Sequence, residues 1–88
     1  MEIINEEKLR PVITSKQVVI ENRPITNVIY DDDGDWLFFH ADTIKEADAF
    51  ILSIEQIINH DKTLLSLPDM KLGERVKRLN IDDIWEKY

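Results

Sequence analysis

Four aspartates flank one glycine in Asp31-Asp32-Asp33-Gly34-Asp35, the segment whose residue types are best suited to bind a ligand or take part in chemistry. Closely spaced carboxylates beside a glycine are typical of calcium-binding loops. When Gly34 is aligned with the sixth position of an EF-hand loop, Ile29 and His40 fall at the first and twelfth positions, where carboxylates are required. The segment therefore predicts no metal site. It predicts the solvated tip of a β-hairpin.

Both histidines have an aspartate nearby, in His40-Ala41-Asp42 and in His60-Asp61. A nucleophilic site would also need a serine beside a base at a sharp turn. The serines stand instead in helix-capping or helical contexts (Ser15, Ser53 and Ser66). With only two glycines, the chain has no glycine-rich phosphate loop. We therefore expect no enzyme, no catalytic residue and no cofactor.

The one basic cluster, Arg75, Lys77 and Arg78, stands in a chain with 18 acidic and 11 basic side chains and a net charge of -7. Nucleic-acid binding needs a basic surface to neutralise phosphates, so we expect no nucleic-acid partner. The cluster is expected to form exposed ion pairs with Asp82, Asp83 or Glu74, each adding at most about 1 kcal/mol. The acidic excess lies in residues 1–44 and favours a basic protein partner.

The length and composition of the chain predict one small domain spanning residues 1–88. The hydrophobic fraction is 43%, which is ordinary for a globular protein. Residues 1–10 are polar and charged, and we expect a loosely ordered lead-in there. The absence of cysteine excludes disulfides and thiolate zinc sites. Because the first residues resemble no secretory signal and no apolar run approaches the roughly 20 residues of a membrane span, we expect a cytoplasmic protein without a membrane partner.

A β-hairpin is predicted in the first half of the chain. Residues 25–30 are β-branched and aromatic, which favours a strand, and residues 36–40 would return antiparallel to it. Asp33-Gly34 is typical of a two-residue type I′ turn, in which both residues have positive φ. That turn would pair Ile29 with Phe38, Tyr30 with Leu37, Val28 with Phe39 and Asn27 with His40.

This register creates an electrostatic conflict at the tip. Asp32 and Asp35 would lie directly opposite each other, and like charges in that position destabilise a hairpin. Either the loop is wider, or a basic group balances the carboxylates. We favour the second explanation, with the cation supplied by a partner or by the C-terminal half of the chain.

The strand Trp36-Leu37-Phe38-Phe39 is apolar on both faces, whereas the outer face of a two-layer sheet is usually polar. Both faces are therefore expected to be covered, either inside the core or by a partner. Aromatic side chains dominate interface hot spots, so Trp36 would be the natural anchor. The candidate partner-binding residues are Asp31, Asp32, Asp33, Asp35, Trp36 and Phe38.

The remaining elements complete an α+β fold, with a small, mostly antiparallel sheet of about five strands and one or two short helices. Residues 47–59 are ambiguous, because their apolar spacing fits one helix. Ser53 and Gln56, however, have the spacing of a capping box, which favours a strand over 49–52 and a helix over 54–59. The other expected elements are a strand at 11–14, a turn or strand at 16–20, a turn at 62–67 capped by Asp61 and ended by Pro68, and strands at 75–79 and 84–88.

The order of these segments resembles a family of small bacterial proteins of unknown function, some of which are described as immunity-protein-like. The segments are Val-Ile-Thr-Ser, Val-Ile-Tyr-Asp-Asp-Asp-Gly-Asp-Trp-Leu-Phe-Phe, Ile-Glu-Gln-Ile-Ile-Asn-His-Asp, Leu-Leu-Ser-Leu-Pro, Gly73 with Arg75 and Arg78, and Trp85. The resemblance covers residues 11–88. It implies a compact α+β domain and a role in binding and blocking a toxin, and it carries no catalytic residues.

We therefore expect a small acidic protein-binding module without enzymatic activity, most specifically an immunity-like inhibitor of a basic toxin. The alternative is a housekeeping protein, either a small-molecule-binding domain or an accessory subunit. Such a protein would pair with its own copy through the 36–39 strand or through an open sheet edge.

Overall fold

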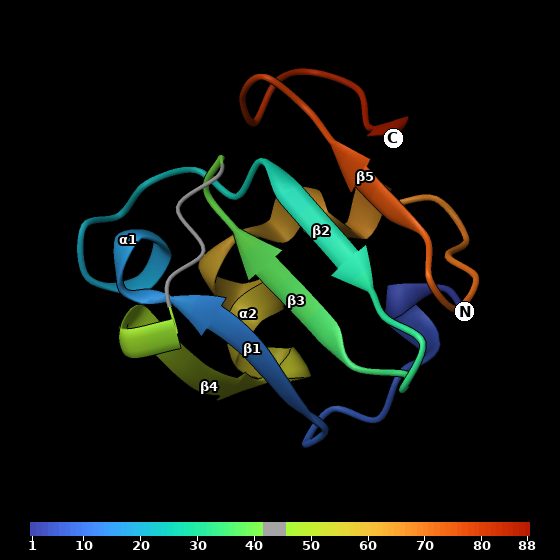
Figure 1. Cartoon of the computed structure of the whole chain (residues 1–88), viewed down its shortest axis with the longest axis horizontal. Helices are drawn as coiled ribbons and strands as arrows, with labels where there is room; N and C mark the ends of the chain where they lie inside the picture. Colours follow the sequence, from blue (N-terminus) through green and yellow to red (C-terminus); the bar gives the residue numbers. More distant parts are fainter. Residues whose placement is uncertain (42–45) are drawn as a thin grey trace.

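The computed structural model describes residues 1–41 and 46–88 and confirms the predicted α+β class (Figure 1). A six-stranded sheet of order β4-β1-β3-β2-β5-β6 is accompanied by two α-helices and short 3-10 turns. The strands are β1 (Pro11–Ser15), β2 (Asn27–Tyr30), β3 (Trp36–Phe39), β4 (Ala49–Ser53), β5 (Arg75–Lys77) and β6 (Glu86–Lys87). The helices are α1 (Lys16–Val19) and α2 (Ile54–His60), and the 3-10 turns are η1 (Ile3–Asn5), η2 (Glu46–Asp48) and η3 (Lys62–Ser66).

The sheet is mixed because β1 runs parallel to β3, with Ile13 level with Leu37. The other neighbouring strands pair antiparallel. The two closing strands are shorter than expected. The chain leaves β5 in a turn in which Asn80 Oδ1 accepts the Asp82 N–H at 2.9 Å, and side-chain bonds of this kind favour turns over sheet.

The hydrophobic core lies between one face of the sheet and a layer formed by α2, η1 and η3. Alternation along the strands turns Trp36 and Phe38 of β3 toward this layer, together with Val28 of β2. In the view of Figure 1 the strands lie in front of α2. The buried core residues are Ile3, Val12, Val18, Ile25, Val28, Tyr30, Trp36, Phe38, Ile54, Ile57, Leu64, Leu67, Met70 and Val76.

The ambiguous segment forms a strand followed by a helix, as the capping box favours. Ser53 Oγ accepts the Gln56 N–H at 3.1 Å, and Gln56 Oε1 accepts the Ser53 N–H at 2.9 Å. These bonds satisfy main-chain groups that the first turn of α2 leaves unpaired. Asp61 caps η3 in the same way, accepting the Thr63 N–H at 3.0 Å. Both capping predictions are confirmed.

The N-terminal lead-in is packed against the domain, contrary to the loose segment expected from its polar sequence. Ile3 in η1 is only 2% exposed and belongs to the core. The Met70 N–H donates to the carbonyl of Met1 at 3.1 Å, and the N-terminal ammonium lies 2.8 Å from Asp69. Burial of Ile3, together with these contacts of Met1, therefore holds the lead-in against the domain. A core this small gains stability from every buried aliphatic group.

The hairpin between β2 and β3 turns through three residues, so the predicted two-residue turn and its register are wrong. The Asp31 N–H donates to Asp35 O, and the Gly34 N–H donates to Asp31 O, both at 3.0 Å. Gly34 has φ +82°, whereas Asp33 does not adopt a positive φ. This combination is a type I turn followed by a glycine bulge. The facing pairs are Tyr30 with Trp36, Ile29 with Leu37, Val28 with Phe38 and Asn27 with Phe39.

The two turn types make opposite predictions for Asp33→Gly. In a type I′ turn Asp33 would have positive φ, so Asp33→Gly would stabilise the protein. In the observed loop Asp33 does not have positive φ, so Asp33→Gly only increases the conformational entropy of the unfolded chain. We therefore expect Asp33→Gly to lower the free energy of unfolding by roughly 0.4–1 kcal/mol. Gly34→Ala should cost about 1–2 kcal/mol, and Gly34→Asn less, because asparagine tolerates positive φ better. Urea denaturation measures all three, and stabilisation by Asp33→Gly would contradict the three-residue loop.

The indole N–H of Trp36 is buried in the core without a hydrogen-bond acceptor among the described residues. Its indole is 0% exposed and stacks on Tyr30 with ring centroids 4.5 Å apart, yet no acceptor in the described residues reaches Nε1. An unsatisfied buried donor costs about 1–3 kcal/mol, which Trp36→Phe would remove along with part of the ring. We expect Trp36→Phe to cost less than about 2 kcal/mol by urea denaturation, against about 3–5 kcal/mol for Trp36→Ala. Equal costs for the two variants would contradict this account.

Candidate functional site

An apolar row crosses the face of the sheet that points away from α2. Ile13 on β1 pairs with Ile51 on β4 and lies level with Leu37 on β3, which in turn pairs with Ile29 on β2. Ile51 is 71% exposed, and the other three are partly exposed. We call these four side chains (Ile13, Ile29, Leu37 and Ile51) the outer row.

The outer row departs from the pattern of a two-layer domain, in which the face away from the helices is polar. The second apolar face of β3 was expected to be covered. Phe39 is indeed only 3% exposed, but Leu37 on the same face is covered only in part. Adjacent aliphatic side chains on an exposed face are typical of interaction surfaces.

The acidic tip lies beside the Ile29–Leu37 part of the outer row, two residues away along β2 and β3. Alternation places Asp31 on the same side of β2 as Ile29, and Asp35 on the same side of β3 as Leu37. The Asp31 carboxylate accepts the N–H groups of Asp33 and Asp35 at 3.0 and 2.9 Å, so Asp31 helps to shape the loop. The two faces of the hairpin thus differ, and the outer one combines aliphatic groups with carboxylates.

A basic group does balance the tip, but it comes from the lead-in and not from the C-terminal half. Arg10 donates to the carbonyl of Gly34, and its Nη2 lies 3.9 Å from Asp35 Oδ1. The predicted conflict between Asp32 and Asp35 disappears because the wider loop no longer places them opposite each other. Asp32 instead lies against Gly73, whose N–H donates to Tyr30 O at 2.7 Å.

The structure divides the six predicted partner-binding residues into two groups. Asp32, Asp33 and Asp35 are exposed at the tip, and Asp31 is partly buried there. Trp36 and Phe38 are both 0% exposed in the core, so neither ring is available as an anchor. Leu37 lies between these two residues in sequence and points outward, and Ile29 is its partner on β2. Neither was among the predicted residues. The correct turn length would have identified Ile29, because it decides which residue of β2 lies beside Leu37.

The edge of the sheet formed by β5 and β6 has a cluster of basic and aromatic side chains. The guanidinium carbon of Arg75 and the ammonium of Lys77 lie 4.7 and 5.2 Å from the centre of the Tyr88 ring. Lys87 pairs with Glu74 at 2.8 Å. This hydrogen bond is the main reason that the pKa of Glu74 lies below its ordinary value. The outer row is therefore bounded by carboxylates at the tip and by cations beyond β2.

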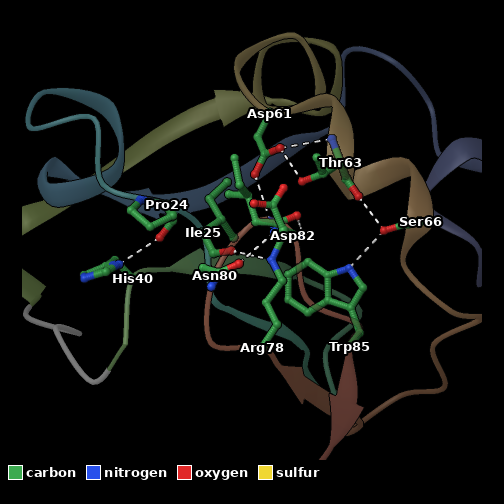
Figure 2. A network of polar contacts seen from close by, with 11 residues as sticks. Pro24, Ile25, His40, Asp61, Thr63, Ser66, Arg78, Asn80, Asp82 and Trp85 are labelled. Atoms are coloured by element: carbon green, nitrogen blue, oxygen red, sulfur yellow. Dashed lines mark hydrogen bonds and ion pairs between the residues drawn. The ribbon is translucent and has the colours of Figure 1, made fainter.

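Arg78 is buried and joins three segments of the chain (Figure 2). Its side chain is 1% exposed, and Nη2 lies 3.0 Å from the carboxylate of Asp61. Nε donates to Ile25 O at 3.0 Å, and the guanidinium stacks over the Trp85 ring at 4.0 Å. Burial lowers the pKa of Arg78, while the nearby Asp61 carboxylate opposes that shift. The expected exposed pairing of Arg78 with Glu74, Asp82 or Asp83 is therefore wrong.

His40 and the serines lie within hydrogen-bond distance of nearby groups of the protein, and His60 is exposed. His60 is exposed beside a hollow of about 370 Å³, but the adjacent Asp61 carboxylate already binds Thr63 and Arg78. His40 Nδ1 lies 2.9 Å from Pro24 O, and Asp42 lies outside the described residues. The serine hydroxyls act as caps or loop bonds: Ser15 with Val18, Ser53 with Gln56, and Ser66 with Thr63 and Trp85.

The described residues contain neither a cluster of metal ligands nor a helix that could cross a membrane. No three histidine or acidic side chains among them are grouped as metal ligands would be. Within the same residues, no helix is both long and apolar enough to cross a membrane.

Comparison of the chain with models of known protein families found no match, and no curated protein or solved structure matches it either. The resemblance to immunity-like proteins therefore stays a prediction.

The buried contacts of Arg78 predict a large effect of its removal. Arg78→Ala leaves Asp61 and Ile25 O without their partner and should lower the free energy of unfolding by about 3 kcal/mol. Arg78→Lys should recover only part of this loss, because an ammonium cannot reproduce the planar stack on Trp85. Lys77→Ala, at the neighbouring exposed cation, is the control and should cost less than about 0.5 kcal/mol. Equal costs for Arg78→Ala and Lys77→Ala in urea denaturation would show that the network contributes little.

Proposed function

We propose that this chain is a protein-binding module without enzymatic activity and that its contact surface is the outer row. The supporting observation is the position of Ile13, Leu37 and Ile29 in register on a face that no helix in the described residues covers. An aliphatic surface of this kind gains free energy when a partner removes it from water, at roughly 25 cal/mol per Å². A partner-binding face also gives a reason for aliphatic residues at positions that are usually polar in a two-layer domain.

The charges around the outer row favour a basic partner. Asp31 and Asp35 lie beside Ile29 and Leu37 of the row, and Asp32 and Asp33 extend the acidic surface beyond them. The net charge of -7 would steer a basic protein toward this chain and raise the association rate. An immunity-like inhibitor of a basic toxin fits this combination of apolar and acidic groups. Arg10 neutralises only part of the tip, since its contacts reach Gly34 and Asp35.

A binding role is favoured over catalysis because the Asp61 carboxylate and the serine hydroxyls already make structural hydrogen bonds. The Asp61 carboxylate binds Arg78, and the hydroxyls of Ser15, Ser53 and Ser66 hold the local turns. The alternative of a small-molecule-binding or accessory subunit makes a different prediction. Such a protein would bind a small molecule or its own copy, and it would capture no other protein through the outer row.

Binding assays with matched variants test the proposed surface. The first probe is the protein encoded by the neighbouring reading frame, co-expressed with the tagged chain, followed by proteins captured from lysate and identified by mass spectrometry. Ile29→Thr combined with Leu37→Thr places β-branched threonine, a good strand former, at both positions and makes the row polar. We expect this double variant to bind at least about tenfold more weakly, which corresponds to about 1.4 kcal/mol.

Ile4→Thr combined with Leu65→Thr is the matched control, because it changes two exposed aliphatic residues outside the sheet. It should bind as the unaltered chain does, and thermal unfolding should show that both double variants are folded. Binding should also weaken as salt rises from about 0.05 to 0.5 M, since screening shortens the range of the acidic tip. Failure to bind any protein, or equal binding by the two double variants, would refute the proposed surface.

A further inference from the structure

Strand β4 lies at the edge of the sheet and lacks the features that usually protect an edge. Among residues 1–41 and 46–88 it pairs only with β1, through an uninterrupted register from Pro11–Ser53 to Ser15–Ala49, and no labelled helix or strand lies beyond it in Figure 1. Natural edge strands are kept from pairing by charges, proline, bulges or a covering loop. The sequence Ala-Phe-Ile-Leu-Ser of β4 has no charge and no proline, although charged residues make up 33% of the chain.

The main-chain groups of β4 that point outward follow from its pairing with β1. The Ile54 N–H donates to Arg10 O at 2.9 Å, so this pair is of the hydrogen-bonded type. Because bonded and non-bonded pairs alternate in an antiparallel ladder, Leu52 and Phe50 also bond to β1. The intervening residues, Ala49, Ile51 and Ser53, turn their N–H and C=O groups toward the open edge. Pro11, which has no N–H, accordingly lies opposite Ser53.

One of these outward groups is already satisfied. The Ser53 N–H donates to Gln56 Oε1 at 2.9 Å within the capping box of α2. The Ile51 N–H has no protein acceptor in the described part of the chain. The free edge is therefore short, and it is centred on Ile51.

The side chains of β4 are also incompletely buried. Phe50 and Leu52 point toward the core side of the sheet, yet both remain partly exposed, and Ile51 on the other side is 71% exposed. The neighbouring strand β1 has Val12 and Thr14 fully buried on the same core side. The exposure of Phe50 and Leu52 reflects the lack of a further strand.

We propose that β4 pairs antiparallel with β4 of a second copy of this chain, around a two-fold axis at Ile51. In this register the two Ile51 residues exchange N–H···O bonds, and Ala49 of each copy lies opposite Ser53 of the other. Phe50 lies opposite Leu52 of the other copy on the core side. The Ser53 N–H needs no further acceptor, so the capping box marks the end of the ladder.

Charge favours a second copy over the basic partner proposed for the outer row. A basic partner would find no carboxylate on β4, whereas two uncharged strands bring no like charges into contact, so the net charge of -7 on each copy acts only through screened, longer-range repulsion. In the proposed register Asp48 lies opposite Ile54 of the other copy, so the flanking acidic groups do not face each other. The axis also joins the two outer rows end to end through Ile51. The proposal does not depend on the function assigned to that row.

The interface is small, so dimerisation should be weak and reversible. A ladder centred on five residues falls below the roughly 1,200 Å² of total buried surface that stable complexes need. We expect sedimentation velocity to show a monomer at about 5 µM and a growing dimer fraction between about 50 and 500 µM. Hydrogen exchange should slow at the amide of Ile51 over the same concentration range.

Two variants of Ile51 separate edge pairing from other forms of association. Ile51→Pro removes an outward N–H and leaves the β1–β4 bonds intact, as proline is tolerated on edge strands. Ile51→Lys keeps the main chain and places like charges at the axis. Both variants should stay monomeric up to about 500 µM, with a dimer fraction at least about tenfold lower than that of the unaltered chain. Ile51→Lys tests the proposal independently if Ile51→Pro does not fold.

Leu79→Lys is the matched control for Ile51→Lys, because Leu79 is 89% exposed and lies outside β4. It should dimerise like the unaltered chain. A monomer at about 500 µM for the unaltered chain, or a normal dimer formed by Ile51→Lys, would overturn the proposal. Loss of the dimer in Ile29→Thr with Leu37→Thr, but not in either Ile51 variant, would also overturn it and indicate pairing through the outer row.

Discussion

The position of the turn between β2 and β3 decides the arrangement of the whole sheet. The Asp31 carboxylate binds two main-chain N–H groups of the loop, and Gly34 supplies the positive φ that closes it after three residues. This length places Val28 and Tyr30 beside Trp36 and Phe38 in the core. A one-residue shift would exchange the two faces of β2, because side chains alternate with a period of two. The core and the outer row therefore depend on the same few hydrogen bonds at the acidic tip.

A domain of 88 residues buries little apolar surface, and this chain compensates with contacts from distant segments. Ile3 comes from the lead-in and Met70 from the loop before β5, and both complete the layer that covers the sheet. Arg78 holds the C-terminal segment through Asp61 and through its stack on Trp85. Such a buried guanidinium is stable because its donors are satisfied, and removal of one partner would leave the other desolvated and unpaired.

Three surface features of the sheet underlie the two proposed interactions. An aliphatic row, an acidic tip and an uncharged sheet edge lie on adjacent parts of one sheet, with Ile51 shared by the row and the edge. The row and tip suit a partner with apolar and basic groups, whereas the edge suits another uncharged strand. Since strand pairing uses main-chain groups and row contacts use side chains, the two interactions can occur together on one molecule.

Elements that depend on neighbours within about four residues were predictable from the sequence. The capping box of Ser53 and Gln56 and the cap at Asp61 join groups that are close in the chain. The strands were predictable from their β-branched and aromatic residues. That Trp36 faces the core, that Arg10 reaches the tip and that Arg78 pairs with Asp61 became evident only in the folded protein. The physical reason is that each of these contacts joins segments far apart in sequence, and local spacing carries no information about which distant group will satisfy a charge or cover a side chain.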